Sequence, residues 1–220
     1  MWTALSTCGL DDVDNSVYNQ VVSITDTLDP HVDVPSLPAR DRILTTAYRL
    51  FYRDGIRATG IDKVIAEAGV TKVTFYRHFA SKDVLILAFL ELRHDRWMQW
   101  FQDALDRHTT SRRGRPAVVS AVDEWLTAPS FRGCAFINTV NELGAELPEV
   151  HAITSRHKAD MVAAIKATLP PGPHRARTAQ ALGVAVDGAV VQAQYGQDAA
   201  PAIKALTTIA TALMPHPGKA

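Results

Sequence analysis

Hydrophobic residues recur at helical spacing from Ala39 onward, whereas residues 1–38 show no sustained helical or strand period. The first stripe follows positions i, i+1, i+4, i+7 and i+8, which is the spacing of one buried helix face. Its members are Ile43, Leu44, Ala47, Leu50 and Phe51. Gly55 follows this stripe, and glycine commonly ends helices. The pattern predicts a helix from Ala39 that ends at Gly55.

Three more helices are predicted directly after this one. Thr59, with Asp62 three positions later, is a candidate N-cap for a short second helix. Gly69 permits a tight turn, Thr71 can cap a third helix, and Ser81 can cap a fourth that carries a long apolar stripe. A short helix, a glycine turn and another short helix are the sequence form of a helix-turn-helix motif.

The predicted third helix has two chemically different faces. At 100° per residue, Phe75 and Phe79 share one face. The opposite face carries two cations, a branched apolar side chain and a phenol, namely Lys72, Val73, Tyr76 and Arg77. We expect the aromatic face to pack on the first two helices and the other face to enter the major groove of DNA. A surface helix with two aromatic anchors is the alternative.

The distribution of charge favours the first interpretation. The formal net charge is zero, but residues 1–38 contain six acidic residues and no Lys or Arg. Residues 39–83 contain nine basic and five acidic residues. Such a basic segment is suited to a polyanion such as DNA, although solvated helix faces are often basic too.

Chemistry suggests a role for each side chain at this face. Lys72 and Arg77 can reach phosphates or guanine edges, and Val73 can contact a thymine methyl group. Hydroxyl, phenol and imidazole groups, and residues at helix starts, are suited to phosphates. The predicted DNA contacts are Thr59, Thr71, Lys72, Val73, Thr74, Tyr76, Arg77, His78 and Lys82.

The run Thr71-Lys72-Val73-Thr74-Phe75-Tyr76-Arg77-His78-Phe79-Ala80-Ser81-Lys82-Asp83 contains a specific core, Tyr-x-His-Phe-x-Ser-Lys. Together with five segments that precede it, this run resembles the DNA-binding domain of TetR-family transcriptional regulators over residues 39–92 without a gap. The five segments are Arg42-Ile43-Leu44, Leu50-Phe51, Gly55, Thr59-Gly60-Ile61-Asp62 and Ile65-Ala66-Glu67-Ala68-Gly69-Val70. The resemblance implies that the third helix reads an operator while Tyr76, His78 and Lys82 hold phosphates. The family often has Ser or Thr at the position of Gly60, so that hydroxyl role is assigned to Thr59.

The rest of the chain shows helical stripes throughout, so the predicted fold is all-α. An acidic, disordered arm (1–38) precedes a three-helix helix-turn-helix domain (39–83). The fourth helix joins this domain to a C-terminal helical domain (84–214), which a flexible tail (215–220) follows. The segment Phe-Arg-Gly-Cys-Ala-Phe-Ile-Asn at 131–138 resembles the C-terminal domain in one group of these regulators, which implies ligand binding and dimerisation there.

Two predicted helices near the C-terminus are candidates for a dimer interface. Residues 179–195 are apolar almost all round, and such a helix must be covered on more than one side. Pairing it and the next helix with their symmetry mates would form a four-helix seam. The predicted interface consists of Leu182, Val186, Ala189, Val190, Ala193, Ile203, Leu206, Ala210 and Leu213. An ordinary core within one chain is the alternative.

A ligand pocket is predicted in the same domain. Asn138 and Asn141 share a polar stripe with Cys134, while His157 falls on an apolar helix face. Buried amides and imidazoles need partners, which a plain core or a ligand could supply. The candidate pocket residues are Trp97, Phe101, Trp125, Cys134, Phe136, Asn138, Asn141, His157 and Met161. Glu142, His151 and His157 lack a known metal-ligand spacing, so no metal is predicted, and Asp187 is expected to be a paired structural carboxylate.

Other functional classes find little support. The chain has no Gly-x-Ser-x-Gly, His-Glu-x-x-His, phosphate-loop or dinucleotide motif, so we predict neither an enzyme nor a cofactor. Cys8 and Cys134 are far apart and are expected to be free thiols. No apolar run approaches the roughly 20 residues of a membrane span, and no basic start of a secretory signal is present. We therefore expect a cytoplasmic protein without a membrane partner.

The sequence thus predicts a homodimeric transcriptional regulator, more specifically a repressor, whose partners are double-stranded operator DNA and a small-molecule inducer. A ligand that prefers a splayed dimer would weaken operator binding, with the fourth helix as the lever. The alternative is a helical ligand-binding or scaffold protein that no longer binds an operator.

Overall fold

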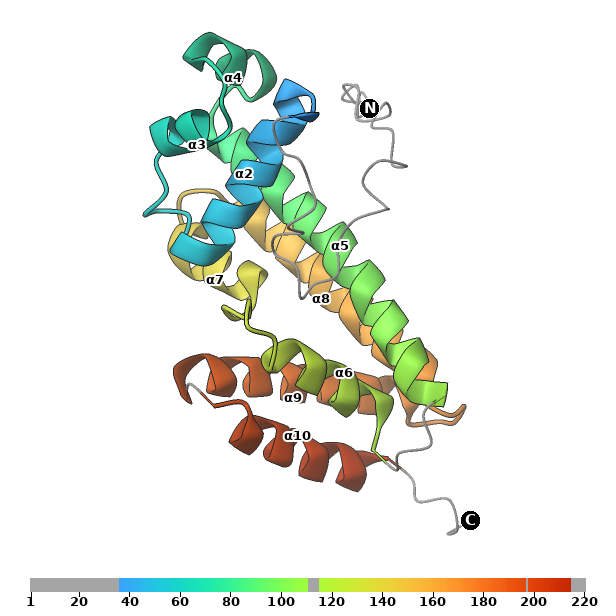
Figure 1. Cartoon of the computed structure of the whole chain (residues 1–220). Helices are drawn as coiled ribbons and strands as arrows, with labels where there is room; N and C mark the ends of the chain where they lie inside the picture. Colours follow the sequence, from blue (N-terminus) through green and yellow to red (C-terminus); the bar gives the residue numbers. More distant parts are fainter. Residues whose placement is uncertain (1–35, 111–114, 197, 215–220) are drawn as a thin grey trace, which may run out of the picture.

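The computed structural model describes residues 36–110, 115–196 and 198–214, and all regular structure in these ranges is helical. The helices, labelled as in Figure 1, are α2 (Ala39–Asp54), α3 (Ile61–Glu67), α4 (Lys72–His78), α5 (Lys82–Thr110), α6 (Ala117–Leu126), α7 (Ala135–Leu143), α8 (Glu149–Thr168), α9 (Arg175–Gly196) and α10 (Ala200–Leu213). The all-α prediction is confirmed. The predicted arm up to residue 35, with Cys8, and the predicted tail lie outside the described residues.

Helices α2, α3 and α4 pack against one another at one end of the molecule (Figure 1). The stripe predicted on α2 is buried, and α2 ends at Gly55, whose φ of 89° lies in the left-handed region that favours glycine. Gly69, with φ of 61°, makes the turn between α3 and α4. The hydroxyl oxygens of Thr71 and Ser81 accept hydrogen bonds from the backbone N–H groups of the first turns of α4 and α5, so both predicted caps are confirmed.

Helix α5 runs from this end of the molecule into the C-terminal domain, with α8 packed alongside it (Figure 1). Their seam contains a cluster of aromatic side chains. Trp97 stacks on Phe101 with ring centroids 4.6 Å apart and meets Trp125 edge-on at 5.2 Å. Among the described residues, no helix combines the length and apolar composition needed to cross a bilayer.

Eight of the nine residues of the predicted dimer interface are wrong. Helices α8 and α10 pack against α9, and α6 packs against α10, so the predicted stripe lies inside one chain. The buried members are Leu182, Val186, Ala189, Val190, Ala193, Ile203, Leu206 and Ala210, and only Leu213 is exposed. Since α9 is apolar on nearly every side, periodicity could not distinguish its inner face from its outer one. The outer faces carry exposed Val184, Val191, Tyr195 and Ile209 instead.

Candidate nucleic-acid interface

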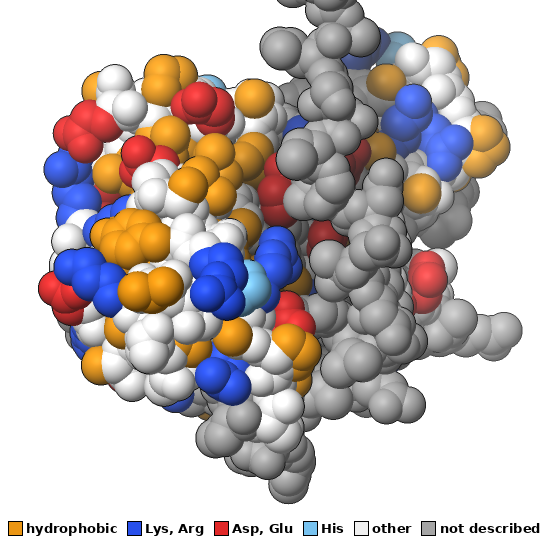
Figure 2. Space-filling model, turned by 90° about the horizontal axis from the view of Figure 1, so that it is seen from above, with side chains coloured by type: hydrophobic (Ala, Val, Ile, Leu, Met, Phe, Trp, Pro, Cys, Tyr) orange, Lys and Arg blue, Asp and Glu red, His pale blue; other side chains and the backbone are white. Residues whose placement is uncertain are grey.

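Helix α4 has the two faces that its sequence predicts. Phe75 and Phe79 are buried, whereas Val73 is 71% exposed and Tyr76 is 43% exposed. The Tyr76 ring meets Phe75 edge-on, with centroids 5.2 Å apart. Figure 2 looks onto this end of the molecule and shows Lys, Arg and His side chains beside apolar ones on the exposed surface. The aromatic pair therefore anchors α4 and leaves its outer edge free for a ligand.

The two cations of that edge are available for binding. Lys72 and Arg77 are exposed, and neither has a hydrogen-bond or ion-pair partner within residues 36–110, 115–196 and 198–214. His78 is exposed at the C-terminal end of the same helix. Thr71 and Thr74 share a hydrogen bond between their hydroxyl oxygens at 2.9 Å, which fixes both side chains at the start of α4. Cations without acidic partners at a surface are suited to phosphate groups.

Two arginines that the sequence analysis missed as positioning residues hold the helix-turn-helix together. The Nε atom of Arg42 donates to the carbonyl oxygen of Ala68 at 3.1 Å, at the end of α3. Arg49 forms an ion pair with Glu67 at 2.5 Å, which ties α2 to α3. Carbonyl groups at a helix end lack intrahelical partners, so Arg42 supplies one from another helix. Hydrophobic periodicity carries no signal for such a contact.

Thr59 does not belong to this surface, so its assignment as a cap and DNA contact is wrong. Its side chain is fully buried, and its hydroxyl donates to the carbonyl oxygen of Gly55 at 2.8 Å. The N-cap of α3 is Gly60, which supplies no side-chain hydrogen bond. A threonine hydroxyl can bond forward to a helix start or back to a preceding carbonyl, and here the second bond forms.

Lys82 lies at the start of α5, as predicted, but its ammonium already has one partner. Its Nζ atom donates to the carbonyl oxygen of Ile56 at 2.6 Å, so it holds the loop between α2 and α3 against α5. Partial burial lowers the pKa of Lys82. An ammonium has three N–H donors, so further hydrogen bonds to a phosphate are chemically available.

Direct hydrogen bonds join the helix-turn-helix to α7. The backbone N–H of Arg57 donates to Glu142 Oε2 at 2.9 Å, and its Nε donates to the carbonyl oxygen of Glu142 at 2.8 Å. A third bond links Arg57 to Glu146. Nearby, the Tyr52 phenol donates to the carbonyl oxygen of Gly133 at 3.1 Å. The two domains are therefore coupled through α7 as well as through the continuous helix α5.

Seven of the nine predicted pocket residues come together in the C-terminal core. They are Trp97, Phe101, Trp125, Cys134, Phe136, His157 and Met161, and all are buried. The assignment of Asn141 is wrong, because its side chain is exposed. Asn138 lies outside this core, where it bonds to the carbonyl oxygen of Arg132 and to Gln194 and lines a separate cavity between α2 and α7. Four cavities in the described part of the chain are all lined by other residues. They form a packed core in this structure.

Some polar groups in and beside this core have hydrogen-bond or ion-pair partners, and one has none. The His157 ring stacks on Phe136 with centroids 3.7 Å apart, and its Nδ1 lies 3.3 Å from Nδ1 of His94. Burial lowers the pKa of His157 to about 2. The indole N–H of Trp97 is buried and has no hydrogen-bond partner within the described residues. Asp187 pairs with Lys158 at 2.5 Å, so its expected role as a paired carboxylate is confirmed.

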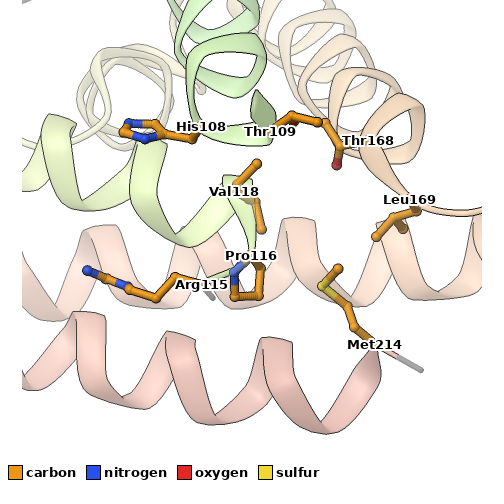
Figure 3. Close-up of a pocket in the computed structure, with 9 residues that line it drawn as sticks. His108, Thr109, Arg115, Pro116, Val118, Thr168, Leu169 and Met214 are labelled. Atoms are coloured by element: carbon orange, nitrogen blue, oxygen red, sulfur yellow. The ribbon is translucent and has the colours of Figure 1, made fainter. Parts of the chain in front are cut away.

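A cavity of about 190 Å³ lies at the opposite end of the C-terminal domain from α4 (Figure 3). Its walls come from the end of α5, the start of α6 and the ends of α8 and α10, including His108, Val118 and Met214. No group of three described His, Cys, Asp or Glu side chains is arranged to hold a metal ion. The outer edge of α4 thus combines two exposed cations, unpaired within the described residues, with a helix that the buried rings of Phe75 and Phe79 hold in place.

Comparison with known proteins identifies relatives of the first domain and of the whole fold. Residues 43–89 match the family model of bacterial regulatory proteins of the tetR family. The chain is 42% identical over 52 residues to the uncharacterized HTH-type transcriptional regulator YerO of Bacillus subtilis. It is 32% identical over 93 residues to the HTH-type transcriptional activator FasR of Mycolicibacterium smegmatis.

These two matches cover different shares of the proteins compared. They span 24% and 42% of this chain, and 18% and 42% of YerO and FasR respectively, so they cover less than half of either relative. The crystal structure of SCO4454, a TetR-family transcriptional regulator from Streptomyces coelicolor, is 28% identical and aligns with a TM-score of 0.64. That alignment covers 80% of this chain and 96% of SCO4454, and it therefore includes the C-terminal helices.

Proposed function

Because the chain belongs to the TetR family of bacterial transcriptional regulators, we propose that it is a sequence-specific DNA-binding homodimer that represses transcription until a small-molecule ligand releases it from its operator. The outer edge of α4 carries this proposal, since its cations are exposed and unpaired while Phe75 and Phe79 hold it from behind. Residues 39–83 bind DNA, and residues 84–214 bind the ligand and dimerise. Such a regulator has no catalytic role and works in the cytoplasm, where bacterial DNA lies.

The proposed DNA contacts divide into two kinds. Lys72, Val73 and Arg77 are centred on the exposed edge of α4, where Val73 can reach base edges in the major groove and the two cations can reach both guanine edges and phosphates. Contacts to phosphate position the protein without reading sequence. We assign these contacts to Thr71, Thr74, Tyr76, His78 and Lys82, and we remove Thr59 from the set because it is buried.

We propose that the outer faces of α9 and α10 form the dimer interface in place of the buried stripe. Exposed, uncharged positions on these faces include Gln180, Val184, Gly188, Val191 and Tyr195 on α9, and Ala205, Ile209, Ala212 and Leu213 on α10. Helices α9 and α10 are packed neighbours, so their outer faces adjoin. A Cβ atom at Gly188 would meet nothing within 4 Å, which leaves room for a partner backbone. Packing both helices against their mates would form a four-helix bundle.

The dimer sets the geometry of DNA binding. Two recognition helices must lie one turn of DNA apart, about 34 Å, to enter successive major grooves. A ligand that binds more tightly to a dimer whose recognition helices have a different spacing lowers the affinity of the protein for the operator. The largest possible decrease is set by the ratio of the ligand's affinities for the two forms of the dimer. We propose that the ligand enters the aromatic core of the C-terminal domain, which is packed in this structure, and the buried, unpaired indole N–H of Trp97 supports this proposal because it leaves a donor for a polar ligand group. Helices α5 and α7 connect that core to the helix-turn-helix.

Fluorescence anisotropy with labelled DNA from the region flanking the gene tests the proposal. The test variant is the double change Lys72→Ala and Arg77→Ala, which removes exposed cations that form no hydrogen bond or ion pair with the described residues. Its affinity should fall for every DNA sequence. The slope of log affinity against log salt should also become shallower by about 0.9 per lost phosphate contact.

The control is the double change Arg156→Ala and Lys166→Ala, which removes two exposed cations of α8, Arg156 together with its ion pair to Glu91. It should bind as the wild type does. If the α4 variant keeps the wild-type affinity and salt slope, the docking model is wrong. If the wild-type protein shows no salt-dependent binding to any duplex, the alternative of a helical ligand-binding or scaffold protein replaces it.

A further inference from the structure

A second cavity lies between the two domains, close to the contact of Arg57 with Glu142. It has a volume of about 250 Å³. One wall is the end of α2 and the residues after it, from Phe51 to Ile56, and the other is formed by α7 and Arg132, with Phe89 of α5 between them. Figure 1 shows α7 beside the C-terminal end of α2. The cavity shares no residue with the aromatic core or with the cavity of Figure 3.

The buried residues of this cavity are mainly apolar, and its more exposed residues are mostly polar or charged. Phe51, Ile56 and Phe89 are each at most 3% exposed, and their side chains line it. Ionisable side chains line its opening, namely Arg53, Asp54, Arg132 and Glu142. An apolar interior with a few polar groups at one side is the usual composition of a small-molecule site. A suitable ligand therefore has a compact apolar body and one polar end.

The charged side chains at the opening of the cavity differ in whether they already have hydrogen-bond partners of opposite charge. Arg53 donates twice to the carboxylate of Asp54, at 2.6 and 2.8 Å, and Lys63 donates to the same group. These bonds hold the pKa of Asp54 well below its usual range. The Glu142 carboxylate accepts the backbone N–H of Arg57. Both acidic groups of the opening are thus already bonded to donors.

Arg132 differs from its neighbours at the opening. Its Nη1 atom donates to the backbone carbonyl oxygens of Pro129 and Phe131, at 3.0 and 2.7 Å. Within the described part of the chain, no carboxylate pairs with its guanidinium. The carbonyl oxygens fix the position of the guanidinium and leave its remaining N–H donors and its charge for an anion.

We propose that this junction cavity binds a small organic anion, with its carboxylate on Arg132 and its apolar body on Phe51 and Phe89. The volume is below the roughly 300 Å³ at which most ligand pockets begin, so the ligand is of about the size of benzoate. Its two walls belong to different domains, and a bound anion therefore stabilises their docked arrangement. Binding does not require DNA, so this proposal does not depend on operator recognition.

Isothermal titration of the full chain with sodium benzoate, in the absence of DNA, tests the site. Benzoate should bind once per chain, and benzamide, which has the same shape without the charge, at least tenfold more weakly. Arg132→Gln should weaken benzoate binding by about tenfold or more, because a charge-assisted pair is lost. Arg156→Gln removes an exposed guanidinium of α8 that does not line the cavity, and it should leave the benzoate affinity unchanged.

A second variant tests the apolar wall without changing charge. Ala135 lines the cavity from α7, and Ala135→Leu should reduce its volume and weaken benzoate binding. Circular dichroism of each variant identifies any that fails to fold. The proposal is overturned if folded Arg132→Gln binds benzoate as tightly as the wild type, if benzamide binds equally well, or if the wild-type chain does not bind benzoate. Operator binding in parallel separates that failure from failure of the proposed DNA-binding function.

Discussion

Arg57 and Glu142 lie 85 positions apart in the chain and share two hydrogen bonds, at 2.9 and 2.8 Å. Arg57 follows α2 in the helix-turn-helix, and Glu142 lies in the last turn of α7. The other end of α7 carries Phe136, whose ring stacks on His157 in the aromatic core. Helix α7 therefore spans the distance between the core and the DNA-binding domain. A shift of α7 in response to a ligand would move the loop that holds α3 and α4.

We expect Glu142→Ala to release this loop. The backbone N–H of Arg57 then loses its acceptor, so its amide hydrogen should exchange with solvent faster than in the wild type. Hydrogen exchange of a peptide covering residues 55–60, followed by mass spectrometry, measures the change. Glu149→Ala, at the exposed start of α8, is the control and should leave the exchange of this peptide unaltered. Unaltered exchange in Glu142→Ala would mean that this contact does not restrain the loop.

Tyr52→Phe should destabilise the protein by about 1–3 kcal/mol. The phenol donates to the carbonyl oxygen of Gly133 and accepts the backbone N–H of Arg132, each at 3.1 Å, so its removal leaves both groups unpaired. Phenylalanine keeps the ring over which the Arg93 guanidinium lies at 4.1 Å. Urea unfolding gives the free energy of unfolding for both proteins.

Tyr76→Phe is the matched control for this change, because the Tyr76 phenol is on the exposed edge of α4. Its free energy of unfolding should differ from the wild-type value by no more than about 0.5 kcal/mol. If both tyrosine variants are equally stable, the two hydrogen bonds of Tyr52 contribute nothing to the docking of the domains.

The stability of the fold should decrease as pH falls below the ordinary pKa of histidine. Burial lowers the pKa of His157 to about 2, while in the unfolded chain it is near 6.5. Between these values the unfolded state binds one more proton than the folded state. The free energy of unfolding should therefore fall by up to about 1.4 kcal/mol for each pH unit below 6.5 from this group alone.

Urea unfolding at pH 7 and pH 5 measures this slope, and His157→Gln should reduce it. Nuclear magnetic resonance of the wild-type protein gives an independent test, because the His157 ring should stay neutral for as long as the protein is folded. His78→Gln, an exposed change on α4, should leave the slope unaltered. An imidazole of His157 that titrates near pH 6.5 in the folded protein would contradict the prediction.

The helix-turn-helix could be predicted from sequence because its signals are local. Thr71 lies three residues before the N–H group that it caps, and Phe75 and Phe79 are one helical turn apart. The loop before α3 was predicted less well, because the hydroxyl of Thr59 had two partners available and the choice depended on the carbonyl of Gly55. The bond between Arg57 and Glu142 has no local signal at all.

Prediction from local sequence patterns is limited in the same way for the hydrophobic residues of the C-terminal domain. The apolar stripes predicted a helix at α9, but Val186 faces the core and Val184 faces outward on the same helix. Which valine is buried depends on where α8 and α10 pack, and those helices come from other parts of the chain. For the same reason the polar stripe of the predicted pocket is divided in the structure, because Cys134 is buried, Asn138 lines the cavity between α2 and α7, and Asn141 is exposed.

The outer face of α9 offers the sharpest test of the assembly. Gly188→Arg adds a long charged side chain where a Cβ atom meets nothing within the chain, so the subunit should fold normally, with some gain in helix stability from the loss of glycine. In the proposed dimer the same side chain enters the interface between the two copies of α9. Sedimentation should therefore give a monomer, and operator affinity should fall at least tenfold, because two linked recognition helices are needed.

Gly183→Ala, on the inner side of the same helix, provides the contrast. Its Cβ atom would lie 2.6 Å from Cγ2 of Val162, so the substitution should lower the free energy of unfolding and leave the outer face unchanged. The two glycine substitutions therefore distinguish an effect on dimer formation from an effect on the stability of the fold, within one helix. If the Gly188→Arg protein remains a dimer in sedimentation, the outer face of α9 is not the interface.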